Sequence, residues 1–221
     1  MFISRICINN FRNFHNLDVA LGPTTVVVGE NSVGKSNLLF ALRLILDPRM
    51  ADSTRQLREE DFWDGLTDPV KGKEIIEVAV EFQDFKKDKH IFTVLQPFCV
   101  KGPVQDTARL TYRYRPRSPL PKGRELTTED YEFVVFGGVD EKNRVVHDDR
   151  RWIPLEVLPA LRDAESDLST WRQSPLRPLI EQLKLSPSTL ESVATAIDQA
   201  TGQLLAEKDV QQLTPSIGDR L

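Results

Sequence analysis

The chain has 221 residues, enough for one large domain or two small ones. Its composition is 40% hydrophobic and 28% charged, with a formal net charge of −4, which is typical of a globular protein and predicts no overall attraction to DNA or to a membrane. It contains no apolar run of about 18 residues that could span a bilayer, and its two cysteines are too few for a disulfide framework or a zinc site. We expect a cytoplasmic protein with reduced thiols.

The first fifty residues alternate between strand and turn signals. Residues 2–8 are rich in β-branched side chains and predict a strand, and a polar and aromatic turn follows at 9–14. A second short strand is expected at 17–21. The apolar run at 24–28 predicts a buried strand, and 37–46 predicts a helix.

Between that strand and that helix, residues 29–36 fit the pattern G-x-x-x-x-G-K-[ST] of a phosphate-binding loop. Gly29 and Gly34 let the backbone wrap around phosphate oxygens, and backbone N–H groups at the helix N-terminus attract a polyphosphate. Lys35 is expected at the β- and γ-phosphates, and the Ser36 hydroxyl is the expected Mg²⁺ ligand. The cofactors are therefore expected to be ATP and Mg²⁺. The residues predicted to bind the nucleotide are Gly29, Glu30, Asn31, Ser32, Val33, Gly34, Lys35, Ser36 and Asn37.

Longer stretches carry a family resemblance. "ISRICINNFRNF" and "TTVVVGENSVGKSNLLFALRLIL" resemble the start of the ABC-type ATPase heads of the RecF and SMC group. "GENSVGKSNLLFALRLILDP", followed by "LREEDFW", is most similar to the OLD (overcoming lysogenization defect) family, which includes the ATPase subunits of Gabija-like antiviral defence systems. A later stretch, "VLPALRDAESDL", resembles another block of that family.

The resemblance also assigns residues outside the phosphate loop. It implies that Asn10, Arg12 and Asn13 lie close to the nucleotide; the alternative for Arg12 is a solvated turn residue. Gln83 directly follows a strand expected at 75–82, where ABC ATPases carry a glutamine that reaches Mg²⁺ and the attacking water. Gln83 is a catalytic candidate by position only, and the alternative is an ordinary residue at the end of a strand.

Two further segments have two readings each. Arginines and tyrosines alternate over Arg109–Arg124, which fits either a DNA contact surface or a half-exposed strand with its arginines on one face. The apolar run at 131–136 continues to Asp140 and Glu141, as a Walker B strand would. However, Gly137 and Gly138 interrupt the run, so we expect a hairpin in an antiparallel sheet.

After Trp152 the pattern becomes helical, and an apolar stripe predicts a dimerisation or arm helix or packing against its own domain. The stripe consists of Leu190, Val193, Ile197, Ala200 and Leu204. We expect two parts, an ATPase lobe at 1–151 and a helical arm at 152–221. The resemblance implies a second ATPase half and a Toprim nuclease domain that this chain does not contain, because no signature segment or Walker B strand is evident.

The predicted fold class is α+β or α/β, the N-terminal part of an ABC-type P-loop ATPase head with a β-rich lobe and a helical segment. The resemblance implies an ATP-binding fragment of a homodimeric, ATP-dependent DNA endonuclease of phage defence, with DNA and a possible partner defence protein as its partners and no membrane association. Two alternatives remain: a RecF- or SMC-like repair ATPase without a nuclease, and a nucleotide-dependent interaction module without turnover.

Overall fold

The computed structural model describes residues 1–30, 33–102, 106–121 and 123–157, and the single positions Glu191, Ser192, Thr195 and Gln199. The chain divides into two compact units, Met1–Val157 and Leu158–Leu221. The five residues of the predicted helical stripe lie outside the described residues. The predicted division at 151 and 152 therefore stays a prediction.

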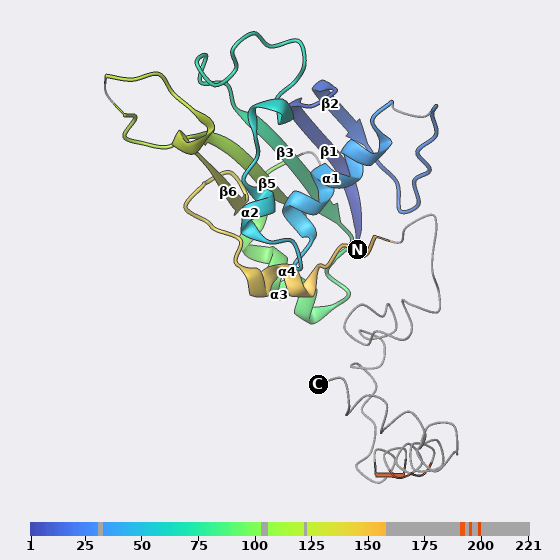
Figure 1. Ribbon diagram of the computed structural model, residues 1–221. Coiled ribbons are helices and arrows are strands. Elements are labelled where there is room, and N and C mark those ends of the chain that lie inside the picture. Colours follow the sequence, from blue (N-terminus) through green and yellow to red (C-terminus); the bar gives the residue numbers. More distant parts are fainter. Residues whose placement is uncertain are drawn as a thin grey trace, which may run out of the picture. The chain divides into compact units, whose positions relative to one another are not determined.

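One antiparallel sheet organises the first unit (Figure 1). Its strand order is β2-β1-β3-β5-β4. β6 also pairs with β5, further along that strand than the short β4 does. The strands are β1 (Phe2–Phe11), β2 (Phe14–Ala20), β3 (Ile76–Gln83), β4 (Cys99–Val100), β5 (Thr107–Pro116) and β6 (Tyr131–Gly137).

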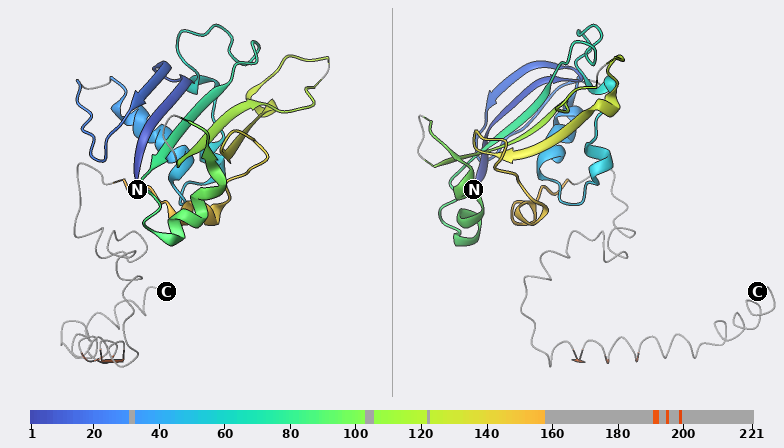
Figure 2. Two further views of the ribbon diagram at one scale, coloured as in Figure 1. Left: turned by 180° about the vertical axis from the view of Figure 1, so that it is seen from behind. Right: turned by 90° about the vertical axis from the view of Figure 1, so that its left-hand side faces the viewer.

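The core lies against one face of this sheet, as the alternation of residue types predicts. On β5, Leu110, Tyr112 and Tyr114 are fully buried, while Arg109 and Arg113 on the opposite face remain partly exposed. The long helix α1 (Lys35–Leu46) supplies the facing apolar stripe, which consists of Ala41, Leu42, Leu44, Ile45 and Leu46. Figure 2 shows α1 and α2 on the same side of the sheet.

The remaining helices are short. They are α2 (Asp52–Arg55), α3 (Lys89–Leu95) and α4 (His147–Trp152), with 3₁₀ turns η1 (Glu59–Asp61), η2 (Gln96–Phe98) and η3 (Thr128–Asp130). Over the part of the chain that the structure describes, none of the helices has the length and apolar character needed to cross a bilayer.

The predicted strand at 24–28 is wrong. Residues 23–30 carry no strand, and Val26 and Val28 are 79% and 84% exposed. Within the described residues no strand pairs with this run, and strand propensity has little effect without a neighbouring strand and a face to bury. The apolar run before the phosphate loop is thus an exposed connection.

The hairpin expected at 131–146 is confirmed. The Gly137 N–H donates to the Asn143 carbonyl and the Val145 N–H donates to the Val135 carbonyl, so the chain turns back along β6. Glu141 lies in that turn and pairs with Arg113 on β5. The mixed fold with an antiparallel sheet and a phosphate-loop helix is the one expected for the N-terminal part of an ABC-type ATPase head.

Candidate nucleotide-binding site

The last glycine of the phosphate loop is required by the structure. Gly34 has φ +105° and immediately precedes α1. A Cβ at this position would lie 2.1 Å from Nδ2 of Asn13, so both the backbone angle and the close contact exclude a larger residue. The backbone of the phosphate loop at Gly34 is therefore in contact with the side chain of Asn13, which belongs to the β1–β2 turn.

The N-terminus of α1 is open to an anion. Its first turn contains no acidic residue, and no described side chain caps it. The first intrahelical bond runs from the Leu38 N–H to the Gly34 carbonyl, so the preceding N–H groups have no partner within the helix. Ser36 lies exposed in this first turn. Unpaired N–H groups beside a glycine loop suit a phosphate group.

Lys35 folds back over the loop. Its Nζ donates hydrogen bonds to the carbonyl oxygens of Gly29 (2.7 Å) and Glu30 (2.6 Å). The ammonium therefore lies on the loop itself, where it can exchange two neutral carbonyl acceptors for charged phosphate oxygens. Asn31 and Ser32, which the sequence also predicts as ligands, lie outside the described residues.

A chain of polar contacts leads from η1 to the phosphate loop. We call its four side chains the polar support: Asp61, Arg12, Asn37 and Asn13. Arg12 Nε donates to Asp61 Oδ1 (2.9 Å), and Arg12 Nη1 donates to Asn37 Oδ1 (2.9 Å). Asn37 Nδ2 donates to Asn13 Oδ1 (2.8 Å), and Asn13 Nδ2 donates to the Val33 carbonyl (3.2 Å). The contacts connect η1 to the phosphate loop through the first turn of α1.

Arg12 is not a solvated turn residue. Its side chain is 29% exposed, and the guanidinium lies 4.4 Å from the ring centroid of Phe40 and 5.1 Å from that of Phe11. Its backbone is in the left-handed region at φ 48°. The structure thus places Arg12 beside Asn37, and its predicted contact with the nucleotide stays a prediction.

The sequence did not identify Asp61 as a site residue. Backbone bonds from the Arg12 N–H to the Asp61 carbonyl (2.9 Å) and from the Trp63 N–H to the Asn10 carbonyl (3.0 Å) join the segment after η1 to the β1–β2 turn. The available signal was the family block "LREEDFW", whose single buried carboxylate is Asp61. Nothing in the sequence indicated that Arg12 is its partner.

Gln83 is placed elsewhere. It pairs with Phe2 at the start of β1, whereas Asn13 and Gly34 lie beyond Phe11, at the other end. Nine residue steps separate Phe2 from Phe11, or roughly 30 Å along a strand. Gln83 Nε2 donates to Thr107 Oγ1 (3.4 Å). The structure does not bring Gln83 to the phosphate loop.

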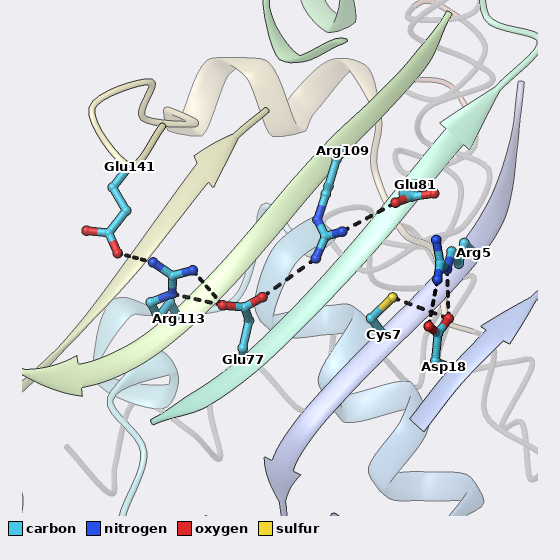
Figure 3. A network of polar contacts seen from close by, with 8 residues as sticks. All are labelled: Arg5, Cys7, Asp18, Glu77, Glu81, Arg109, Arg113 and Glu141. Atoms are coloured by element: carbon cyan, nitrogen blue, oxygen red, sulfur yellow. Dashed lines mark hydrogen bonds and ion pairs between the residues drawn. The ribbon is translucent and has the colours of Figure 1, made fainter. Parts of the chain in front are cut away.

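The arginines of β5 lie in a network of ion pairs on the outer face of the sheet (Figure 3). Arg113 pairs with Glu77 (2.6 Å) and Glu141, and Arg109 pairs with Glu81 (3.4 Å). With the pairs of Arg5 and Arg115, four guanidinium groups face five carboxylates. This balance favours the half-exposed strand over a DNA contact surface, because phosphate binding needs uncompensated positive charge.

The first turn of α1 offers one candidate ligand for a metal ion, the Ser36 hydroxyl. Across residues 1–30, 33–102, 106–121 and 123–157, no three His, Cys, Asp or Glu side chains form a cluster that could hold a metal ion. A phosphate-bound Mg²⁺ needs few protein ligands, and Ser36 is the described hydroxyl at the right place. The residues present are therefore compatible with a metal carried on the nucleotide.

Comparison with known proteins agrees with this geometry. A family model described as an AAA ATPase domain matches residues 1–205. The DNA replication and repair protein RecF of Gloeobacter violaceus is 39% identical over 80 residues, 36% of this chain and 19% of that protein. The endonuclease GajA of Bacillus cereus VD045 is 47% identical over 47 residues, 21% and 8% of the two chains.

Two further similarities extend over more of the chain. The uncharacterised protein YbjD of Escherichia coli K12 is 32% identical over 165 residues, 73% of this chain and 29% of YbjD. A solved structure from work on ATP-driven dimerisation and DNA-stimulated activation of SMC ATPases covers 89% of this chain and 99% of its own, at 16% identity and a TM-score of 0.41. The chain spans less than a third of the length of these curated relatives.

Proposed function

Because the chain belongs to the AAA ATPase domain family, we propose that residues 29–37 bind ATP together with Mg²⁺. One observation carries the proposal: Gly34, at φ +105°, precedes an uncapped helix N-terminus, and Lys35 folds back onto the carbonyls of Gly29 and Glu30. Backbone N–H groups and the lysine would hold the phosphates, and the Ser36 hydroxyl would hold the metal ion.

The described residues supply binding and orientation. Lys35 offsets the charge of the β- and γ-phosphates, and the polar support fixes the loop through Asn13 and Asn37. When bound, Mg²⁺ supplies further neutralisation of charge at the phosphates. No carboxylate of the described chain forms a bond with the loop that would mark it as a general base. We therefore propose nucleotide binding with little or no hydrolysis by this chain alone.

For the whole protein we propose an OLD-type, ATP-dependent DNA endonuclease in which ATP controls dimerisation or DNA engagement. The 47% identity with the endonuclease GajA over 47 residues supports this reading, and an antiviral role with a partner defence protein would follow from it. Both described cysteines are free, which fits the cytoplasm that we propose.

Two other functions remain in competition. The similarity to RecF supports a DNA-repair ATPase without a nuclease. The lack of a metal cluster within the described residues also fits a module that binds nucleotide and a partner without turnover. A Toprim domain encoded downstream in the gene would favour the nuclease, and turnover by the full-length protein without DNA cleavage would favour the repair ATPase.

The first experiment measures Mg·ATP binding and phosphate release by the 221-residue chain. Lys35→Ala should abolish binding, whereas Lys87→Ala, which changes an exposed lysine paired with Asp84, should bind normally. Unchanged affinity in Lys35→Ala would disprove the site. Lysine-dependent turnover would show that the active site is complete within this chain and would contradict the proposal of binding alone.

A further inference from the structure

A basic cavity lies away from the phosphate loop. It has a volume of about 360 Å³ and lies between α2, β6 and the segment 144–150. Three arginines line it, Arg55, Arg144 and Arg150, together with His147, and Asp52 is the one acidic residue in the lining. Three guanidinium groups against one carboxylate leave a formal charge of +2. The other lining residues are apolar or aliphatic, among them Met50, Phe133 and Val135.

Arg150 is the unusual residue of this cavity. It is 7% exposed, and its Nε has no hydrogen-bond partner among the described residues. Its Nη2 donates to the Val145 carbonyl at 3.3 Å, a long bond to a neutral acceptor. Within the described chain Arg150 forms no ion pair, although arginine is rarely buried without one. Burial, together with the neighbouring Arg55 charge, lowers the pKa of Arg150.

Arg55 shows how the same fold satisfies a buried guanidinium. It is 2% exposed and donates to the carbonyls of Leu44 (3.0 Å), Met50 and Asp47 (2.5 Å), and to Asp52 (3.3 Å). All its nitrogens have acceptors. Arg150 lies in the same cavity with one weak acceptor. A buried charge that lacks acceptors costs several kcal/mol or so unless a ligand supplies them.

We propose that this cavity binds the phosphate group of a small molecule, with Arg150 and Arg144 as its ligands. The phosphate oxygens would accept from the guanidinium of Arg150, whose bond to the Val145 carbonyl is long, and from Arg144, which is exposed and forms no ion pair with any residue the structure describes. The volume admits a free phosphate or a mononucleotide, and the apolar walls would contact its organic part. Nucleic acid is the competing source of phosphate.

The cavity is separate from the ATP site. Lys35 opens α1, whereas Met50 of the cavity lies beyond its other end. The 12 residues of α1 span about 18 Å. The inference therefore does not depend on the proposed function, and each can fail without the other.

The test removes the phosphate loop from the measurement. In a Lys35→Ala background, inorganic phosphate should raise the melting temperature of the 221-residue chain at constant ionic strength, and titration should give a dissociation constant. Adding Arg150→Met should weaken phosphate binding at least about tenfold, the loss expected for a charge-assisted bond. Without phosphate the Arg150→Met chain should be as stable as its parent, because an apolar side chain replaces an under-bonded charge.

Variants of two other arginines test whether the loss of phosphate binding is specific to the cavity. Arg58→Met changes an exposed arginine outside the cavity and should leave phosphate binding unchanged. Arg144→Met should weaken binding by about three- to tenfold and decides the matter if the Arg150 variant does not fold. Equal binding in all variants, or no response to phosphate, would overturn the site. Adenosine monophosphate should bind through the same arginines. Binding of an oligonucleotide alone would overturn the small-molecule assignment.

Discussion

At the scale of single residues, the contact between Gly34 and Asn13 joins the end of the phosphate loop to the β1–β2 turn. The glycine has no Cβ, so the Asn13 amide can approach its Cα and bond to the neighbouring Val33 carbonyl. The same asparagine accepts from Asn37 in the first turn of α1. One amide thus holds the loop and the helix that follows it in a fixed relation.

Gly34→Ala should therefore disturb the loop in two ways. The new Cβ would clash with Asn13, and φ of +105° is unfavourable for alanine, so we expect a loss of about 1–3 kcal/mol in the free energy of unfolding. ATP affinity should fall at least about tenfold. Urea unfolding and ATP titration measure both effects. Gly102→Ala, where a Cβ would meet nothing within 4 Å, is the matched control.

We expect Asp61 to position the loop from a distance, through Arg12. Its side chain is 11% exposed and accepts from Arg12 and from the Arg58 N–H. Asp61→Asn should cost about 1.5–3 kcal/mol of stability, because the charge-assisted bonds to Arg12 weaken. It should also weaken ATP binding severalfold by releasing Arg12 from Asn37.

Glu60→Gln provides the control for that substitution, since its side chain is 76% exposed. It should change stability by no more than about 0.5 kcal/mol. If Asp61→Asn lowers stability but leaves the ATP dissociation constant unchanged, the polar support is structural only and does not position the loop.

At the scale of elements, buried tyrosines connect the sheet to the loops that cover it. Tyr112 and Tyr114 of β5 donate to the carbonyls of Arg55 (2.5 Å) and Leu57 (2.7 Å), and Tyr131 of β6 donates to the Glu74 carbonyl (3.2 Å). The connection between α1 and β3 is thus held by phenol hydroxyls where it has little regular structure of its own.

Tyr114→Phe should lower the free energy of unfolding by about 1–2 kcal/mol, because the buried Leu57 carbonyl loses its donor.

Alkaline pH should also lower the free energy of unfolding. Burial raises the pKa of Tyr114 to about 12, above the ordinary value of about 10, so the native state favours the neutral phenol. The stability that the neutral Tyr114 hydroxyl contributes is therefore fully present below a pH of about 10, and it is lost as the pH rises through about 12.

Thermal unfolding between neutral and strongly alkaline pH, followed together with tyrosinate absorbance, measures this loss. The Tyr114→Phe chain should start less stable and lose less stability over that pH range than the wild type. Equal losses in the two chains would show that Tyr114 does not contribute to the alkaline transition.

The sequence predicts correctly those elements whose hydrophobic pattern is matched by neighbouring strands and a core to pack against. From Arg109 to Arg115, β5 alternates arginine or threonine with leucine or tyrosine, and the sheet buries the leucine and the tyrosines as period two requires. The run at 24–28 has an equally strong strand pattern but no neighbouring strand among the described residues, and pattern alone does not reveal a missing neighbour. Asp61 could not be paired with Arg12 because 49 residues separate them.

At the scale of the whole molecule, exposed valines gather beside the phosphate loop. Val26, Val27 and Val28 are exposed and line an apolar groove of about 430 Å³ together with Val19 and Val33. Contiguous exposed apolar surface of this kind drives association. In the predicted homodimer, we expect the second copy of the chain to cover this surface.

The double substitution Val26→Lys and Val28→Lys should therefore reduce self-association of the 221-residue chain, measured by size-exclusion chromatography with light scattering over a range of concentrations. Val139→Lys is the matched control, because Val139 is 89% exposed in the turn after β6. If the wild-type chain stays monomeric, or if the control has the same effect, the valines do not mediate association.

The bonds between the β1–β2 turn and the segment around Asp61 also bear on how the site arises during synthesis. A nascent chain that has reached residue 60 already contains the whole Gly29–Ser36 motif, but Asp61 and Trp63, which hold Arg12 and Asn10, have not yet been added. Proteins grow from the N-terminus, and a domain folds as a unit once its partners have emerged. The full ATP affinity should therefore appear on the ribosome only after the Asp61 segment has left the exit tunnel, because Arg12 has no carboxylate partner before then.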